Sequence, residues 1–154
     1  MMIRPIYIDL EGADLTGKST LLMTTFKEGD YSKLMCFHDR GIMTHYVYNK
    51  CFNRFPEDLD MWFDQLIKFL EAGNGIIILT AGVSTIGERF GERSDDLFKL
   101  DRILAVNEEY IKLYFELSPT YDTVRLISTD DKTPKEIYKE ASSFYGKMFL
   151  RGTE

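Results

Sequence analysis

The chain has 154 residues, of which 44% are hydrophobic and 29% charged, and it carries a formal net charge of −6. This length accommodates one ordinary domain, expected to run over residues 1–154, and the composition is that of a globular protein with a sizeable core. The acidic balance argues against a nucleic-acid partner, because extended contacts with phosphates favour a basic surface.

Three features favour a cytoplasmic protein. No apolar run approaches the roughly 20 residues of a membrane helix, which argues against a membrane partner. The first residues, MMIRPIYIDLEG, carry acids where a signal peptide would need an apolar stretch. Cys36 and Cys51 stand in apolar or aromatic surroundings without CxxC spacing, so we expect reduced packing residues.

The first half of the chain predicts two strands and two helices. The segments IYIDL at 6–10 and LMCF at 34–37 are short and apolar, as buried strands are. Helical patterns run from Lys18 to Phe26 and from Pro56 to Ala72, where Gly73 ends the helix. The apolar face of the second helix comprises Leu59, Trp62, Phe63, Leu66, Ile67 and Leu70.

The second half continues this alternation. GIIIL at 75–79 and VRLI at 124–127 predict two more strands, and the uninterrupted IIIL run indicates a strand covered on both faces. Between them, a long helix that ends before Pro119 is marked by Leu97, Leu100, Ile103, Leu104, Ile111 and Tyr114. The last helix is expected to begin with a capping box and a proline at its first position, at Thr133, Pro134 and Glu136. Its buried residues are expected to be Ile137, Ala141, Phe144 and Met148. Strands alternating with helices predict an α/β fold, a three-layer sandwich around a mainly parallel sheet of about four to five strands.

Residues 12–19, GADLTGKS, match the pattern G-x-x-x-x-G-K-[ST] between a predicted strand and a predicted helix. The glycines let the backbone turn tightly so that its N–H groups face phosphate oxygens, and the helix adds its positive end. Lys18 would reach the β- and γ-phosphates, while the Ser19 hydroxyl would ligate Mg²⁺. We therefore predict a P-loop NTPase fold that binds ATP and Mg²⁺. The predicted nucleotide-binding residues are Gly12, Asp14, Leu15, Thr16, Gly17, Lys18, Ser19 and Thr20.

The predicted strand at 34–37 runs into His38, Asp39 and Arg40. Asp39 can hold Mg²⁺ directly or through water, and Arg40 can bind an acceptor phosphate with two N–H groups. The structural alternative is a surface turn with an Asp–Arg pair. His38 and His45 are interpreted as structural residues rather than metal ligands.

Residues 84–96, STIGERFGERSDD, place Arg89 and Arg93 four apart and so on one helical face. Arginines on a closing segment can stabilise the negative charge that phosphoryl transfer spreads over the moving group. Gly82, Gly87 and Gly91 would let the segment move, which predicts a mobile arginine lid near 84–96. The alternative is an exposed helix whose arginines pair with the acids around them.

These stretches together resemble the thymidylate kinase branch of the P-loop nucleoside and nucleotide kinases. IDLEGADLTGKSTL is similar to that family's EGxDxxGKST loop, HDRG to its Asp-Arg motif and ERFGER to its arginine lid. EEYIKLYFEL followed by YDTVRLIST resembles its long helix and last strand.

The resemblance implies a role for each matching residue. Lys18, Ser19 and the loop backbone would hold the ATP phosphates, and Asp14 would face the acceptor sugar. Asp39 and Arg40 would lie near Mg²⁺ and the acceptor phosphate, and the segment 130–134 would pack against adenine. Arg89 and Arg93 would act from the lid. Relatives in this branch are often homodimers, so a homodimer remains open.

One departure concerns the acceptor. Between Lys18 and Asp39 the family usually has a further strand and an acceptor-binding segment with an Arg-Glu-Pro-Gly stretch, which this chain lacks. Part of the acceptor pocket is therefore expected from an aromatic-rich span, although such aromatics are more often core residues: Tyr46, Tyr48, Phe52, Phe55 and Trp62.

The chemistry of the acceptor separates the candidate functions. A monophosphate is already ionised near pH 7 and needs cations, whereas a nucleoside hydroxyl needs a carboxylate base. Because Arg40 supplies a cation, we expect ATP-dependent phosphoryl transfer to a (deoxy)nucleoside monophosphate. The alternatives are a deoxynucleoside kinase, a kinase with another acceptor such as a polynucleotide 5′ end, and an ATP-binding protein without kinase activity. The predicted catalytic residues are Lys18, Asp39, Arg40, Arg89 and Arg93, with Ser19 and Asp39 as metal ligands.

Overall fold

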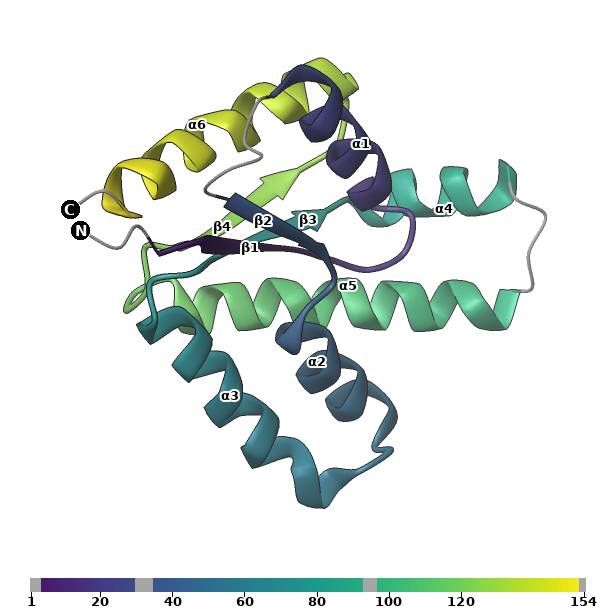
Figure 1. Cartoon of the computed structure of the whole chain (residues 1–154). Helices are drawn as coiled ribbons and strands as arrows, with labels where there is room; N and C mark the ends of the chain where they lie inside the picture. The colour runs from purple at the N-terminus through teal and green to yellow at the C-terminus, as the bar shows by residue number, and fades with distance from the viewer. Residues whose placement is uncertain (1–3, 30–34, 93–96, 153–154) are drawn as a thin grey trace.

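The computed structural model describes residues 4–29, 35–92 and 97–152. Within these ranges, four strands alternate with six α-helices and one short 3-10 helix (Figure 1). The strands are β1 (Ile6–Glu11), β2 (Met35–Asp39), β3 (Gly75–Thr80) and β4 (Val124–Ser128). The helices are α1 (Lys18–Glu28), α2 (Ile42–Phe52), η1 (Pro56–Asp58), α3 (Leu59–Glu71), α4 (Val83–Glu92), α5 (Leu97–Leu117) and α6 (Pro134–Gly152).

The four strands form one sheet in the order β2-β1-β3-β4, and every neighbouring pair is parallel. The predicted parallel sheet is therefore confirmed, and all four strands end at the same edge. From β1 the chain first forms the strand on one side, β2, and then returns to form β3 on the other side of β1. The loops after β1 and β3 thus start from a switch point in strand order, which is where open α/β sheets bind ligands.

Helices cover both faces of the sheet (Figure 1). On one face, Ile8 and Leu10 of β1 pack with α1 and α6. On the other, Ile76 and Ile78 of β3 pack with α2, α3 and α5. All six residues of β3 are buried, as the uninterrupted apolar run predicted. This arrangement is compatible with the expected three-layer α/β fold.

Local signals placed most elements correctly. The capping box is present at the start of α6, where the Thr133 amide donates to Glu136 Oε2 at 2.7 Å and the Glu136 amide donates to Thr133 Oγ1 at 3.3 Å. Pro134 is the first residue of that helix. The four residues expected to be buried in α6 are buried: Ile137, Ala141, Phe144 and Met148.

Helix α2 was not predicted. Its sequence, IMTHYVYNKCF, is rich in β-branched and aromatic residues, which have weak helix propensity, and its apolar residues do not fall on one side. Contacts with α3 and α5 through buried Met43, Tyr46 and Val47 stabilise it instead. The expectation that both cysteines are packing residues was wrong for Cys36, which is exposed on β2. Within the described ranges, no helix has the combination of length and apolar character that crossing a membrane requires.

Candidate functional site

A glycine-rich loop, residues 12–17, joins the end of β1 to the start of α1. Gly12 has φ 136°, and a side chain there would bring its Cβ to 2.4 Å from the Leu79 carbonyl oxygen. Gly17, at the N-terminal cap of α1, has φ 96°. Both positions require glycine, because L side chains are strained at positive φ and Gly12 also presses against β3. The loop is therefore held against the carboxyl edge of the sheet.

Lys18, the first residue of α1, is buried and lies back over this loop. Its Nζ donates to the Ala13 carbonyl oxygen at 2.7 Å, and the Thr16 hydroxyl donates to the same oxygen at 2.7 Å. Burial, followed by the charge of Arg40, lowers the pKa of Lys18 to about 8. The ammonium group is thus partly desolvated, a state in which an approaching anion is attracted more strongly than it would be in bulk water.

Asp39 and Arg40 stand where β2 ends. Asp39 is exposed, and Arg40 adopts φ 70°. The Arg40 amide donates to Leu10 at 3.0 Å, its guanidinium donates to Asp14 in the loop, and its Cζ lies 5.6 Å from the centre of the Tyr48 ring. The turn after β2 is therefore tied to the turn after β1.

The predicted binding residues of both turns line one cavity of about 180 Å³, which we call the loop cavity. Its lining comprises Asp14, Leu15, Gly17, Lys18, Ser19, Thr20, Asp39 and Arg40. The sequence predicted Asp39 and Arg40 to act beside the glycine-rich loop, and the structure brings both turns to one cavity. Gly12 and Thr16 shape the loop and do not line this cavity.

Two buried carboxylates, Asp9 and Glu11, lie behind the Asp39–Arg40 turn and were missed by sequence reasoning. Glu11 accepts hydrogen bonds from the Gly41 amide at 2.7 Å, the Thr44 hydroxyl at 2.5 Å and the Tyr110 hydroxyl at 2.9 Å. Burial raises its pKa despite these donors. Two of these donors, Gly41 and Thr44, lie at the start of α2, and Tyr110 belongs to α5, so Glu11 ties β1 to both helices and fixes the backbone next to Arg40.

Asp9 completes this contact between β1 and α2. It accepts from the Ile42 amide and pairs with His38 Nδ1 at 2.7 Å, while burial raises its pKa. A Cβ at Gly41 would lie 1.8 Å from Asp9 Oδ2, so only glycine fits there. The alternation of IYIDLE, which puts Asp9 and Glu11 on one face of β1, was the available signal.

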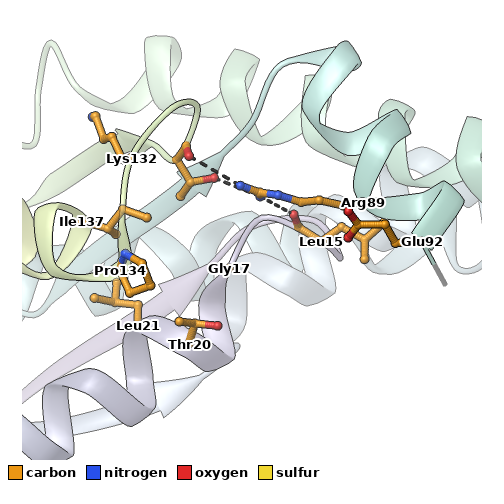
Figure 2. Close-up of a pocket in the computed structure, with 10 residues that line it drawn as sticks. Leu15, Gly17, Thr20, Leu21, Arg89, Glu92, Lys132, Pro134 and Ile137 are labelled. Atoms are coloured by element: carbon orange, nitrogen blue, oxygen red, sulfur yellow. Dashed lines mark hydrogen bonds between the residues drawn. The ribbon is translucent and has the colours of Figure 1, made fainter.

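A second cavity, of about 350 Å³, lies on the α4 and α6 side of the glycine-rich loop (Figure 2). We call it the Arg89 cavity. Arg89 Nη1 donates to the Leu15 carbonyl oxygen at 2.7 Å and to Thr129 Oγ1 at 3.2 Å. Lys132 and Pro134, from the segment expected near an adenine ring, also line it. Its full lining is Leu15, Gly17, Thr20, Leu21, Arg89, Glu92, Thr129, Lys132, Pro134 and Ile137.

The predicted lid is described only in part. Helix α4 carries Arg89 to the glycine-rich loop. Arg93 lies outside the described residues, as do residues 94–96. The mobility of the segment and the role of Arg93 stay predictions.

A third cavity, of about 300 Å³, lies on the α2 and α5 side of the loop, and we call it the Phe52 cavity. Its lining comprises Asp14, Leu15, Tyr48, Phe52, Arg54, Lys99, Arg102, Ile103 and Val106. Of the aromatic residues proposed for an acceptor pocket, Tyr48 and Phe52 therefore face it. Tyr46 belongs to the core, and Trp62 stacks on His45 with ring centres 4.4 Å apart. Phe55 and Trp62 line a separate cavity beside it.

The loop cavity lies between the other two. It shares Leu15, Gly17 and Thr20 with the Arg89 cavity, and Asp14 and Leu15 with the Phe52 cavity. Molecules bound in the two outer cavities would consequently meet at the loop, over Lys18 and beside Arg40.

The donors around the loop cavity suit a hard cation. Ser19 supplies a hydroxyl and Asp39 a carboxylate, both exposed to the same space. Mg²⁺ prefers oxygen ligands and usually takes one or two from protein and the rest from phosphates and water. Among the described residues, no group of three or more histidine, cysteine, aspartate or glutamate side chains could hold a metal. The end of β3 offers Thr80 rather than an acid, and Thr80 donates to Asn107 at 3.0 Å.

The sequence of this chain matches no protein-family model, and no curated protein is similar to it.

Proposed function

We propose that the chain is a P-loop kinase that transfers the γ-phosphoryl group of ATP to a (deoxy)nucleoside monophosphate. The observation that carries this proposal is the order of the cavities, with a cation-bearing loop between two spaces of ligand size. Phosphoryl transfer requires two bound molecules whose reacting ends meet among positive charges, with water excluded. The loop cavity offers that meeting point.

The Arg89 cavity suits the nucleoside part of the donor. Leu21, Pro134 and Ile137 offer apolar surface to a planar base, while Arg89 and Lys132 are cationic. Gly17 and Thr20, shared with the loop cavity, lie at the start of α1. A helix start with exposed backbone N–H groups and a positive dipole end binds phosphate, so a nucleotide could run from this cavity into the loop.

The loop cavity suits the transferred group. In this proposal Lys18 leaves the Ala13 carbonyl to pair with the β- and γ-phosphates, while Ser19 and Asp39 hold the metal. Bound Mg²⁺ would neutralise charge on the phosphate oxygens. Arg89 would add positive charge from α4 and exclude water, which matters because an open site would hydrolyse ATP instead.

The carboxylates near the loop cavity are mostly engaged, which favours a monophosphate acceptor over a nucleoside. A nucleoside hydroxyl needs a carboxylate free to take its proton. Glu11 is buried and engaged by three donors, and Asp14 pairs with Arg40. Asp39 remains as the base of the alternative, a deoxynucleoside kinase. Arg40 donates to Asp14 through Nη2, and because a guanidinium carries five N–H donors, others can orient an acceptor phosphate at the loop cavity.

Product analysis tests the proposal. The protein is incubated with Mg·ATP and each of a panel of deoxynucleosides, their monophosphates, or buffer alone. We expect diphosphate product from a monophosphate, and turnover lower by orders of magnitude in Lys18→Ala. Lys27→Ala is the matched control, because Lys27 is an exposed lysine in the last turn of the same helix.

The other outcomes separate the alternatives. Monophosphate produced from a nucleoside would favour the deoxynucleoside kinase, with Asp39 as base. ATP binding that depends on Lys18 but yields no product from any acceptor would favour a nucleotide-binding protein without transfer activity. Near-normal turnover in folded Lys18→Ala would refute the kinase proposal altogether.

A further inference from the structure

The Phe52 cavity carries more positive charge than one acceptor phosphate explains. Arg54, Lys99 and Arg102 line it, and among the described residues Asp14 is the one acid in its lining. Asp14 is already paired with Arg40. Three cations thus gather around one space in a chain whose net charge is −6. Such a local excess of positive charge attracts anions to a protein whose net negative charge otherwise repels them.

Among the described residues, no acid holds these three cations. No ion pair joins Arg54, Lys99 or Arg102 to an acid in the part of the chain that the structure describes. Two of them rest on an aromatic ring instead, with Arg54 Cζ 5.4 Å and Arg102 Cζ 5.3 Å from the centre of the Phe52 ring. A ring attracts a guanidinium without using its N–H donors, so those donors stay available to an anion.

The contacts also orient these groups. Arg54 follows the end of α2 and Arg102 belongs to α5, so two separate elements bring guanidinium groups to one ring. Guanidinium groups recognise phosphate with paired N–H groups, and holding them in place lowers the entropy lost on binding. A nucleoside monophosphate has no charge beyond its accepting phosphate, so it would leave Arg54, Lys99 and Arg102 without an anionic partner.

We propose that the Phe52 cavity binds a second phosphate group of the acceptor. This inference rests on the proposed function: Arg40 takes the accepting phosphate at the loop cavity, and Arg54, Lys99 and Arg102 take the other. The substrate class would then be nucleotides with two separate phosphates. The second phosphate could be a terminal monoester, as in a nucleoside 3′,5′-bisphosphate, or the diester of a 5′-phosphorylated dinucleotide.

Binding without ATP tests this directly. Titration calorimetry compares the 3′,5′-bisphosphates and the 5′-monophosphates of the four deoxynucleosides, and then a 5′-phosphorylated dinucleotide of the preferred base. For at least one base we expect the second phosphate to tighten binding about tenfold or more, within the range of charge-assisted contacts. The tighter of the bisphosphate and the dinucleotide identifies the monoester or the diester.

Variants assign the effect to this cavity. Arg54→Gln with Arg102→Gln should reduce the preference for the second phosphate to less than about twofold. Lys99→Gln, which leaves the Phe52 contacts in place, should reduce it in part even if the double variant is destabilised. Arg125→Gln removes an exposed positive charge from β4, outside this lining, and should change nothing.

Two results would overturn the inference: equal affinities for one and two phosphates in the unmodified chain, or a preference that survives in the folded double variant. Failure of the proposed function is distinguishable. If the proposed kinase function is wrong, no acceptor, including the bisphosphates, would give an ATP-dependent product. The preference for two phosphates over one in binding, and its loss in the variants, would still be observed.

Discussion

The substitution Gly41→Ala tests how the buried carboxylates of β1 hold the turn that carries Arg40. Gly41 has a negative φ of −138°, so the glycine is required by space rather than by a positive φ. The new Cβ would lie 1.8 Å from Asp9 Oδ2 and 2.4 Å from Asp9 Cγ. Both atoms belong to a short, buried side chain that His38 and the Ile42 amide hold in place, so Asp9 or the start of α2 must move.

The expected cost follows from what that movement breaks. Overpacking a tight site costs about 1–3 kcal/mol, and weakening the charge-assisted bond from the Gly41 amide to Glu11 adds about 1 kcal/mol or more. We expect the free energy of unfolding to fall by about 2–4 kcal/mol in urea titrations, with an unchanged slope. Turnover should fall as well, because Arg40 is the preceding residue.

Two further variants serve as controls. Gly87→Ala, in the interior of α4 with no atom within 4 Å of the added Cβ, should instead stabilise by about 0.5–1 kcal/mol. Asp9→Ala in the Gly41→Ala background should recover part of the loss, since it removes the atoms in the clash. A Gly41→Ala variant as stable as the unmodified chain would show that α2 is not held as described.

Three other predictions concern single groups. Because the pKa of Lys18 is about 8, its side chain is mostly charged at pH 7 and mostly neutral at pH 9. Calorimetry should therefore show that ATP affinity weakens about tenfold over that range. The same pH dependence of ATP affinity in Lys18→Arg, which keeps its charge, would contradict this role. Tyr110→Phe removes a donor to Glu11 and should lower the free energy of unfolding by about 1–3 kcal/mol. Burial already raises the folded-state pKa of Glu11, so the stability that this group contributes falls as pH rises. Loss of the Tyr110 donor raises that pKa further, so the stability lost in Tyr110→Phe should be larger at pH 8 than at pH 5. A loss of stability that does not change with pH would contradict this role of Tyr110. Thr133→Ala removes the cap of α6 and should cost about 1 kcal/mol in thermal unfolding, whereas Thr133→Ser should not.

Sequence patterns worked where the interactions are local. The capping box of α6 joins residues three positions apart, and the Gly12 and Gly17 positions are dictated by a turn of six residues. The uninterrupted apolar run IIIL likewise predicted burial on both faces of β3. Each of these signals lies within a few consecutive residues, so it can be recognised without knowledge of the fold.

Patterns failed where contacts between distant segments decide the outcome. Helix α2 has little intrinsic preference for its conformation and depends on α3 and α5 for burial. The contact of Glu11 with Gly41 and Tyr110 spans 30 and 99 residues of sequence. No window of sequence contains both partners, so no local pattern could have found them.

The sequence by itself determined the alternation of strands and helices and the chemistry available at the glycine-rich loop, because backbone turns and side-chain types are local properties. Only the tertiary structure decided which cavities meet at that loop and which cations share one ring. Parallel pairing brings turns separated by tens of residues to a single edge of the sheet. The convergence of Arg54 and Arg102 on Phe52 is a product of how α2 and α5 pack, and packing depends on the whole chain.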